Sequence, residues 1–250
     1  MSDLKNNLNG WLNINKEIGM TSREVVNVIQ RTLNIKKVGH AGTLDPLASG
    51  VLAIAVGRKA TKTVKYIMDG EKKYEFSIKW GISTDSYDQD GKIISISKII
   101  PSKLEIKKIL HNFKGEINQR PPRFSAIKIN GMRAYKLARK GEKFDLKSRK
   151  VYVKNIKLID NIKKNDKSLS SFEVECSKGF YIRSLVRDIC KKLKVDGYTI
   201  NLKRTESKPF KIKNSITIKR FLYLYNRNKW KNLCIPIYSV LNNIKYVGKQ

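Results

Sequence analysis

The chain has 250 residues, 40% of them hydrophobic, which is enough to bury the core of one large domain or of one domain with a small appendage. It carries 53 Lys and Arg against 21 Asp and Glu, a formal net charge of +32. A surface of this sign releases counterions when it binds a polyanion, so nucleic acid is the expected partner. A bias of composition toward lysine is the alternative, but it does not explain why acids are so few.

The sequence also argues against a protein stabilised by disulfides or zinc, and against a membrane or secreted protein. Cys176, Cys190 and Cys234 are widely spaced, and only His40 and His111 could join them, so we expect neither a disulfide framework nor a zinc site. No apolar run approaches the roughly 20 residues that span a bilayer, and the polar start lacks the hydrophobic region of a signal peptide. We therefore expect a cytoplasmic protein with no membrane association.

The first half of the chain alternates short strands and helices, as hydrophobic periodicity and capping signals indicate. The predicted elements are a strand over 11–15, a helix from a capping box at 21–24 to residue 33, an ordered loop over 38–50, a strand over 51–56, a short helix near 61–68, a strand over 74–80, a strand over 92–97 able to pair with it, and a helix capped at Ser102 and running to about 113.

The second half begins with a basic stretch, about 115–148, that contains Pro121-Pro122 and an Asn130-Gly131 turn signal and is predicted to protrude as an arm. Strands over 151–159 and 171–177 follow, separated by a polar linker at 161–168, then a helix over 181–193 and a strand near 198–204. Most links are too short for regular βαβ crossovers. The prediction is an α+β fold with a mixed, mainly antiparallel central sheet flanked by helices.

The sequence GHAGTLDPLASGVL at 39–52 carries the strongest chemical signal. Asp45 precedes a proline that restrains its backbone, in a loop anchored on the following apolar strand, and a carboxylate held in this way can act as a nucleophile. An isolated Asp-Pro is usually a turn residue instead. The whole contiguous stretch, however, closely resembles the catalytic motif of the TruB-type tRNA pseudouridine synthases, in which Asp45 would be the catalytic residue.

Other segments resemble the same family in the same order, from Gly10 to about Ile237. They are Lys72-Lys73-Tyr74, the segment GFYIRSLVRD at 179–188, and Leu202-Lys203-Arg204-Thr205. The resemblance implies that Tyr74 stacks on the target uracil, that Arg183 pairs with Asp45, and that Tyr181 and Leu202 line the base pocket. Taken singly, Tyr74 is also consistent with a core aromatic of a strand, and Arg183 with a solvated helix arginine.

The resemblance also implies how RNA is held. A histidine at the position of His40 is inserted into the T loop, the arm grips phosphates, and the segment 15–22 matches the opening motif except that Glu17 replaces the usual proline. Phe124 stands where a tyrosine is typical. The residues assigned to RNA binding are His40, Lys16, Arg123, Arg133 and Lys136.

By this resemblance the chain has the pseudouridine synthase fold, with a catalytic domain at 1–235 and a short stub at 236–250 in place of the usual small RNA-binding domain. The implied reaction is isomerisation of the uridine at position 55 of the tRNA T loop, with base flipping and no cofactor. The expected partner is the tRNA T stem-loop, and no obligate protein partner is expected.

Metal binding is not expected. Asp85, Asp88 and Asp90 before Gly91 superficially resemble a calcium loop, but Ser97 stands where that loop requires a bidentate glutamate. Two other functions stay open. One is a tRNA-folding chaperone in which catalysis is secondary. The other, ranked lower, is a guide-RNA-dependent synthase of the dyskerin type.

Overall fold

The structure is a computed structural model that describes residues 8–159 and 168–245. The chain divides into two compact units. Unit 1 comprises Met1–Tyr74 and Leu202–Gln250, and unit 2 comprises Glu75–Asn201. The chain passes from one unit to the other within two strands, β4 (Lys72–Trp80) and β12 (Gly197–Ser207).

Unit 1 is built on a sheet whose central pair is β1 (Gly10–Lys16) and β3 (Ser49–Val56), antiparallel along the whole of β1. The sheet order is β14-β1-β3-β12, with β12 parallel to β3 and β14 parallel to β1. The outer strands are β14 (Ile216–Thr217), β2 (Val38–His40), which pairs with β3, and β13 (Phe210–Lys211), which pairs with β12.

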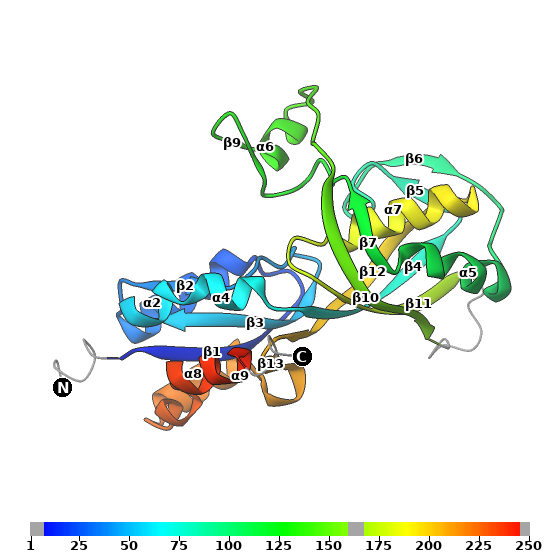
Figure 1. Cartoon of the computed structure of the whole chain (residues 1–250). Helices are drawn as coiled ribbons and strands as arrows, with labels where there is room; N and C mark the ends of the chain where they lie inside the picture. The colour runs from blue at the N-terminus through cyan, green and yellow to red at the C-terminus, as the bar shows by residue number, and fades with distance from the viewer. Residues whose placement is uncertain (1–7, 160–167, 246–250) are drawn as a thin grey trace. The chain divides into compact units, whose positions relative to one another are not determined.

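Alternation along β1 and β3 sends side chains to two separate cores. Leu12, Ile14 and Leu52 face a core covered by α2 (Ser22–Leu33) and α8 (Ile218–Asn226). Trp11 and Ala53 face the opposite core, to which Ala60, Ile67 and Val240 contribute. The helices that supply those three residues are α3 (Arg58–Lys62), α4 (Val64–Asp69) and α9 (Ile237–Lys245). Figure 1 shows α8 and α9, in red, beside β1.

Unit 2 contains the antiparallel strands β11 (Leu169–Cys176), β10 (Arg149–Ile159) and β7 (Gly115–Gln119), which follow β4 in the order β4-β11-β10-β7. The rings of Phe76 on β4 and Phe172 on β11 stack with their centroids 5.3 Å apart. Two helices pack against one another in this unit, α5 (Lys103–Leu110) and α7 (Ile182–Leu193). The short helices η1 (His111–Phe113), η2 (Ile212–Asn214) and η3 (Trp230–Leu233) complete the fold.

Capping and turn motifs in the sequence predicted several boundaries of these elements correctly. Thr21 and Ser102 are the N-caps of α2 and α5, and each forms the predicted capping box with the glutamate three residues later. Asn130 and Gly131 both have positive φ and join β8 (Lys128–Ile129) to β9 (Met132–Arg133), as an Asn-Gly hairpin turn requires. The expected mixed sheet with flanking helices is confirmed.

Two expectations differ from the structure. Residues 93–96 form β6, which pairs with β5 (Ile82–Thr84) and not with β4, because a glycine with positive φ, Gly81, turns the chain before β5. Residues 115–119 belong to the sheet as β7, so the protruding part of the arm begins after Gln119. Residues 237–245, within the segment predicted as a short stub, form α9 and contribute Val240 to a core. The expected linker at 161–168 lies almost wholly outside the described residues.

The segment 120–148, called the arm segment below, consists of the β8–β9 hairpin and α6 (Ala134–Arg139). Figure 1 shows β9 and α6 standing away from β7 and β10 of the same unit. Among the helices of the described residues, none combines the length and the apolar character needed to cross a bilayer.

Candidate active site

Asp45 lies in the loop between β2 and β3, half-buried, in a tight turn closed by a hydrogen bond from the Ala48 N–H to the Asp45 carbonyl (3.0 Å). The loop leaves β2 at Ala41, whose N–H donates to the Ala53 carbonyl (2.9 Å). Gly42 and Gly50 have φ values of 92° and 105°, which only glycine adopts readily. The turn at Asp45 is therefore bracketed by two backbone positions that suit no other residue.

Three buried polar side chains, from three different elements, hold this loop. The Ser22 hydroxyl, at the start of α2, accepts from the Leu44 N–H (2.8 Å) and donates to the Leu44 carbonyl (3.0 Å). The Arg204 guanidinium, on β12, donates to the carbonyls of Gly42 (2.9 Å) and Val51 (2.8 Å). These contacts fix the backbone at Gly42 and Leu44 before Asp45 and at Val51 after it.

Lys16, at the end of β1, is the third. Its side chain is 0% exposed, and its ammonium donates to the carbonyls of Glu17 (2.9 Å), Met20 (2.7 Å) and Pro46 (3.2 Å). Burial lowers the Lys16 pKa to about 8, and the charge of Asp45 opposes that shift. Lys16 therefore holds the loop and places a cation near Asp45, and its role in RNA binding stays a prediction.

Gly50 permits the close approach of the loop's far end to β12. Arg204 pairs with Gly50 in the parallel ladder, and a Cβ at Gly50 would lie 2.2 Å from the Arg204 carbonyl oxygen. The same strand pairing brings the Arg204 side chain under the loop, so substitution of Gly50 would displace a residue that fixes Gly42. We call Lys16, Ser22 and Arg204 the loop clamp.

Unit 1 also carries three other predicted site residues. Tyr74 on β4 and Leu202 on β12 are half-buried and pack against the core under α2. His40 ends β2, and its pKa is lowered by burial and by the charges of Arg204 and Arg23, so the neutral imidazole is favoured at pH 7. Its Nδ1 atom is buried and makes no hydrogen bond within the described residues.

In unit 2, Arg183 lies in the first turn of α7 and is only 5% exposed. Its guanidinium lies 3.2 Å from the Asp88 carboxylate and donates to the carbonyls of Phe124 (2.9 Å) and Ser86 (3.4 Å). Asp88 is a partner that sequence reasoning missed, because the acidic run at 85–90 was considered only as a metal loop. The expected pairing of Arg183 with Asp45 stays a prediction, since the two residues belong to different units.

Tyr181 is the N-cap residue of α7, and its backbone exchanges two hydrogen bonds with the fully buried side chain of Gln119 (2.8 and 3.1 Å). The Arg149 guanidinium carbon lies 4.9 Å from the centre of the Tyr181 ring. The tyrosine is thus held from both its backbone and its ring, in a half-buried position.

The cations expected to grip RNA are exposed on the arm segment. Arg123 donates to the Glu142 carbonyl (2.7 Å) and lies over the Phe144 ring, and Arg133 donates to the Ala126 carbonyl. Lys136 is exposed on α6. Arg123 and Arg133 therefore fold back on the segment's own backbone, and each retains guanidinium hydrogens for another acceptor.

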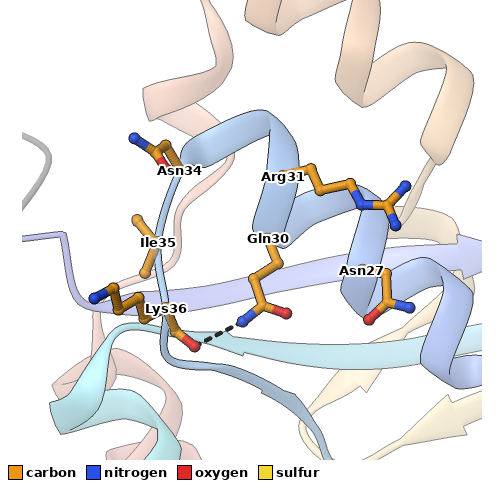
Figure 2. Close-up of a pocket in the computed structure, with 6 residues that line it drawn as sticks. All are labelled: Asn27, Gln30, Arg31, Asn34, Ile35 and Lys36. Carbon is orange, nitrogen blue, oxygen red and sulfur yellow. Dashed lines mark hydrogen bonds between the residues drawn. The ribbon is translucent and has the colours of Figure 1, made fainter.

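Two hollows of the surface contain none of the predicted site residues. One, of about 320 Å³, is shown in Figure 2 and is lined by Asn27, Gln30, Arg31, Asn34, Ile35 and Lys36 at the end of α2. Gln30 bridges it by donating to the Lys36 carbonyl (2.6 Å). The other, also about 320 Å³, lies in unit 2 beside Arg187, Cys190 and Asp196. In the part of the chain that the structure describes, no three His, Cys, Asp or Glu side chains cluster as metal ligands.

Comparison with known proteins identifies the family of the chain. The sequence profile of the TruB family pseudouridylate synthase (N terminal domain) matches residues 30–182, which include the Asp45 loop and end one residue before Arg183. The chain belongs to the TruB family. Among TruB relatives, the tRNA pseudouridine synthase B of Ehrlichia chaffeensis (strain ATCC CRL-10679 / Arkansas) is 44% identical over 239 residues, which cover 96% of this chain and 80% of the relative. That of Rhodospirillum rubrum is 41% identical over 240 residues, covering 96% and 77%.

Solved structures show the same fold. A chain in the crystal structure of a Cbf5-Nop10-Gar1 complex superimposes with a TM-score of 0.72 at 28% identity, and one in an H/ACA RNP bound to a substrate RNA containing 2'-deoxyuridine with 0.71 at 25%. Our chain spans 62% and 63% of their lengths. The TruB relatives therefore support tRNA pseudouridine synthase activity, an isomerisation, for this chain.

Proposed function

We propose that this TruB-family chain isomerises the uridine at position 55 of the tRNA T loop to pseudouridine, with Asp45 as the nucleophile. The observation that carries the proposal is the clamped loop, in which a half-buried carboxylate stands on a backbone fixed by Lys16, Ser22 and Arg204. A nucleophile needs this kind of prior positioning, because loss of orientation costs catalysis heavily.

The reaction balances without a cofactor. Asp45 attacks either C1′ of the ribose or C6 of the base, the N1–C1′ bond breaks, and the uracil turns. A C5–C1′ bond then forms, C5 loses its proton to solvent or base, N1 gains one, and Asp45 is released. Both routes require Asp45 to be ionised, and Lys16 places a positive charge near it within the same unit.

Arg183 is proposed to orient Asp45 through a bidentate pair once RNA is bound, as the family resemblance implies. The contact between Arg183 and Asp88 supports this role, because it holds the nearly buried guanidinium in one orientation. Asp88 is thus a positioning residue for Arg183. Its own charge also offsets the cost of burying the guanidinium.

The target base must leave the stack before Asp45 can reach it, at a cost of about a few kcal/mol. We propose that Tyr74 stacks on the flipped uracil and that Tyr181 and Leu202 line the pocket around it. Neutral His40 is proposed to take the place of the flipped base in the T loop.

The decisive experiment uses the purified chain with an unmodified tRNA transcript and maps pseudouridine at single-nucleotide resolution. We expect modification of uridine 55 alone, and none in a matched transcript that carries cytidine at that position. Modification at another site would overturn the T-loop assignment, and no pseudouridine in any tRNA would overturn the proposed function. Mapping tRNA from cells with and without the gene gives the same test in vivo.

A further inference from the structure

The last 44 residues, 207–250, contain ten Lys and Arg and no Asp or Glu. A solvated helix surface ordinarily mixes both signs, which keeps neighbouring charges from repelling one another. Within this stretch, α8 and η3 form part of unit 1. Five exposed cations lie on or between these two helices: Lys219, Arg220, Arg227, Lys229 and Lys231.

The packing of α8 explains why these cations point outward. Ile218, Phe221 and Tyr225 pack against the core shared with α2, and Trp230 of η3 packs on Tyr225 with ring centres 5.9 Å apart. The helix therefore buries one side, and the positions on its other side are free to meet solvent or a ligand. None of the ion pairs found in the described residues involves any of these five cations.

Tyr223 stands at the centre of this outward face. It is 44% exposed, and the guanidinium carbons of Arg220 and Arg227 lie 5.1 and 4.5 Å from the centre of its ring. Spacings of three and four residues place the three side chains on one side of the helix. Stacking on an aromatic ring restrains an arginine while leaving its in-plane hydrogens available, so both guanidiniums are prepared for phosphate or carboxylate oxygens.

We propose that Arg220, Tyr223, Arg227, Lys229 and Lys231, the α8 surface, form a second RNA-binding surface, which contacts the phosphate backbone of tRNA. It lies on unit 1, whereas the arm segment lies on unit 2, and the two share no residue. The inference rests on the proposed function, since it takes tRNA as the substrate. RNA is favoured over an acidic protein because one sign of charge and a ring for stacking suit a nucleic acid, while apolar side chains suited to a protein interface are few here.

The test replaces Arg220, Arg227, Lys229 and Lys231 together by Gln and measures the affinity for whole tRNA as a function of salt. Each lost phosphate contact should lower the slope of log affinity against log salt by roughly one unit, so we expect a decrease of about two to four units. The apparent KM for tRNA should rise more than kcat falls. Tyr223→Leu, which keeps all charges, should weaken binding less than the fourfold variant does.

A charge-matched control removes four exposed lysines of unit 2, Lys98, Lys107, Lys108 and Lys114, which lie on or beside α5. If the α8 surface acts only through net charge, both variants will change the slope equally, and this result would overturn the inference. So would an unchanged slope in the α8 variant. A failure of the proposed function is distinguishable, because wild-type protein would then form no pseudouridine in tRNA.

A further variant combines the α8 substitutions with Gln at Arg123, Arg133 and Lys136. The decreases in slope should add, because the two regions contact different phosphates.

Discussion

The loop that carries Asp45 and the arm segment are both irregular stretches marked by glycine, but their side chains hold them in opposite ways. The loop is fixed from beneath by Lys16, Ser22 and Arg204, which are 0, 3 and 1% exposed. The arm segment has two-residue strands, and its cations lie outside, where Arg123 and Arg133 donate to its own backbone and Arg120 pairs with Asp145. The difference teaches that buried contacts position the Asp45 carboxylate, while the cations of the arm segment stay exposed.

The largest effect is expected at Asp45. Asp45→Asn keeps the size of the side chain but removes its charge and most of its nucleophilicity, so turnover should fall by about a thousandfold or more while tRNA affinity changes less than about tenfold. Single-turnover assays and binding titrations check both parts. Turnover near that of the wild type would remove Asp45 from catalysis. Loss of binding as well would favour the tRNA-chaperone alternative.

The next effect concerns Arg183, which donates to the Phe124 carbonyl of the arm segment and is proposed to pair with Asp45. Arg183→Lys keeps the charge but loses the planar fork that pairs bidentately with a carboxylate. We expect kcat to fall at least about tenfold. Asp88→Asn should produce a smaller loss of the same kind, because it loosens the guanidinium without removing it. A fully active Arg183→Lys enzyme would contradict the pairing with Asp45.

Ser22→Ala tests whether the clamp acts on the chemical step. It leaves the Leu44 N–H without its acceptor, so we expect a loss of about 1–3 kcal/mol in the free energy of unfolding, and a fall of kcat by roughly threefold to tenfold with little change in KM. Thr21→Ala is the matched control. It removes the N-cap of the same helix and should cost about 1 kcal/mol in stability while kcat stays constant. Equal losses of kcat in the two variants would show that only stability matters.

The arm is expected to act on binding and hardly on turnover at saturation. Replacement of Arg123, Arg133 and Lys136 by Gln should flatten the salt dependence of T stem-loop affinity by up to about three units, roughly one per lost phosphate contact. Titrations over a range of salt concentrations measure the slope. An unchanged slope would mean that the arm segment does not bind RNA. The arm segment would then differ from the Asp45 loop in its contacts but not through a role in binding.

The smallest effect is a pH dependence of stability caused by Lys16. Its pKa is about 8 in the folded chain, against an ordinary value of 10.5, so between these values the folded chain has released a proton that the unfolded chain keeps. Stability must therefore rise with pH across that window. Relative to Lys16→Met, the wild type should gain about 1 kcal/mol per pH unit or less, after allowance for solvent screening. Urea unfolding at pH 7, 8.5 and 10 measures the difference, and a constant difference would refute it.

Local patterns predicted much of this fold, since capping boxes at Thr21 and Ser102, the Asn130-Gly131 turn and the alternation along β4 act over a few residues. The clamp could not be predicted in this way. Arg204 reaches Gly42 across 162 positions of sequence through a parallel strand pair that no local pattern specifies. Lys16 ends an apolar strand and was predicted to bind RNA. Only the fold shows the carbonyls that surround its ammonium.

The clamp has a consequence for the temperature dependence of the reaction. Its hydrogen bonds are made when the chain folds, so the entropy of ordering residues 42–48 is lost before any RNA arrives. Neither binding nor bond cleavage then has to supply it. The activation entropy of the wild-type reaction should be small, and its rate should vary with temperature chiefly through the enthalpy of breaking the glycosidic bond. A chain with a loosened loop would instead show a more negative activation entropy at the same activation enthalpy.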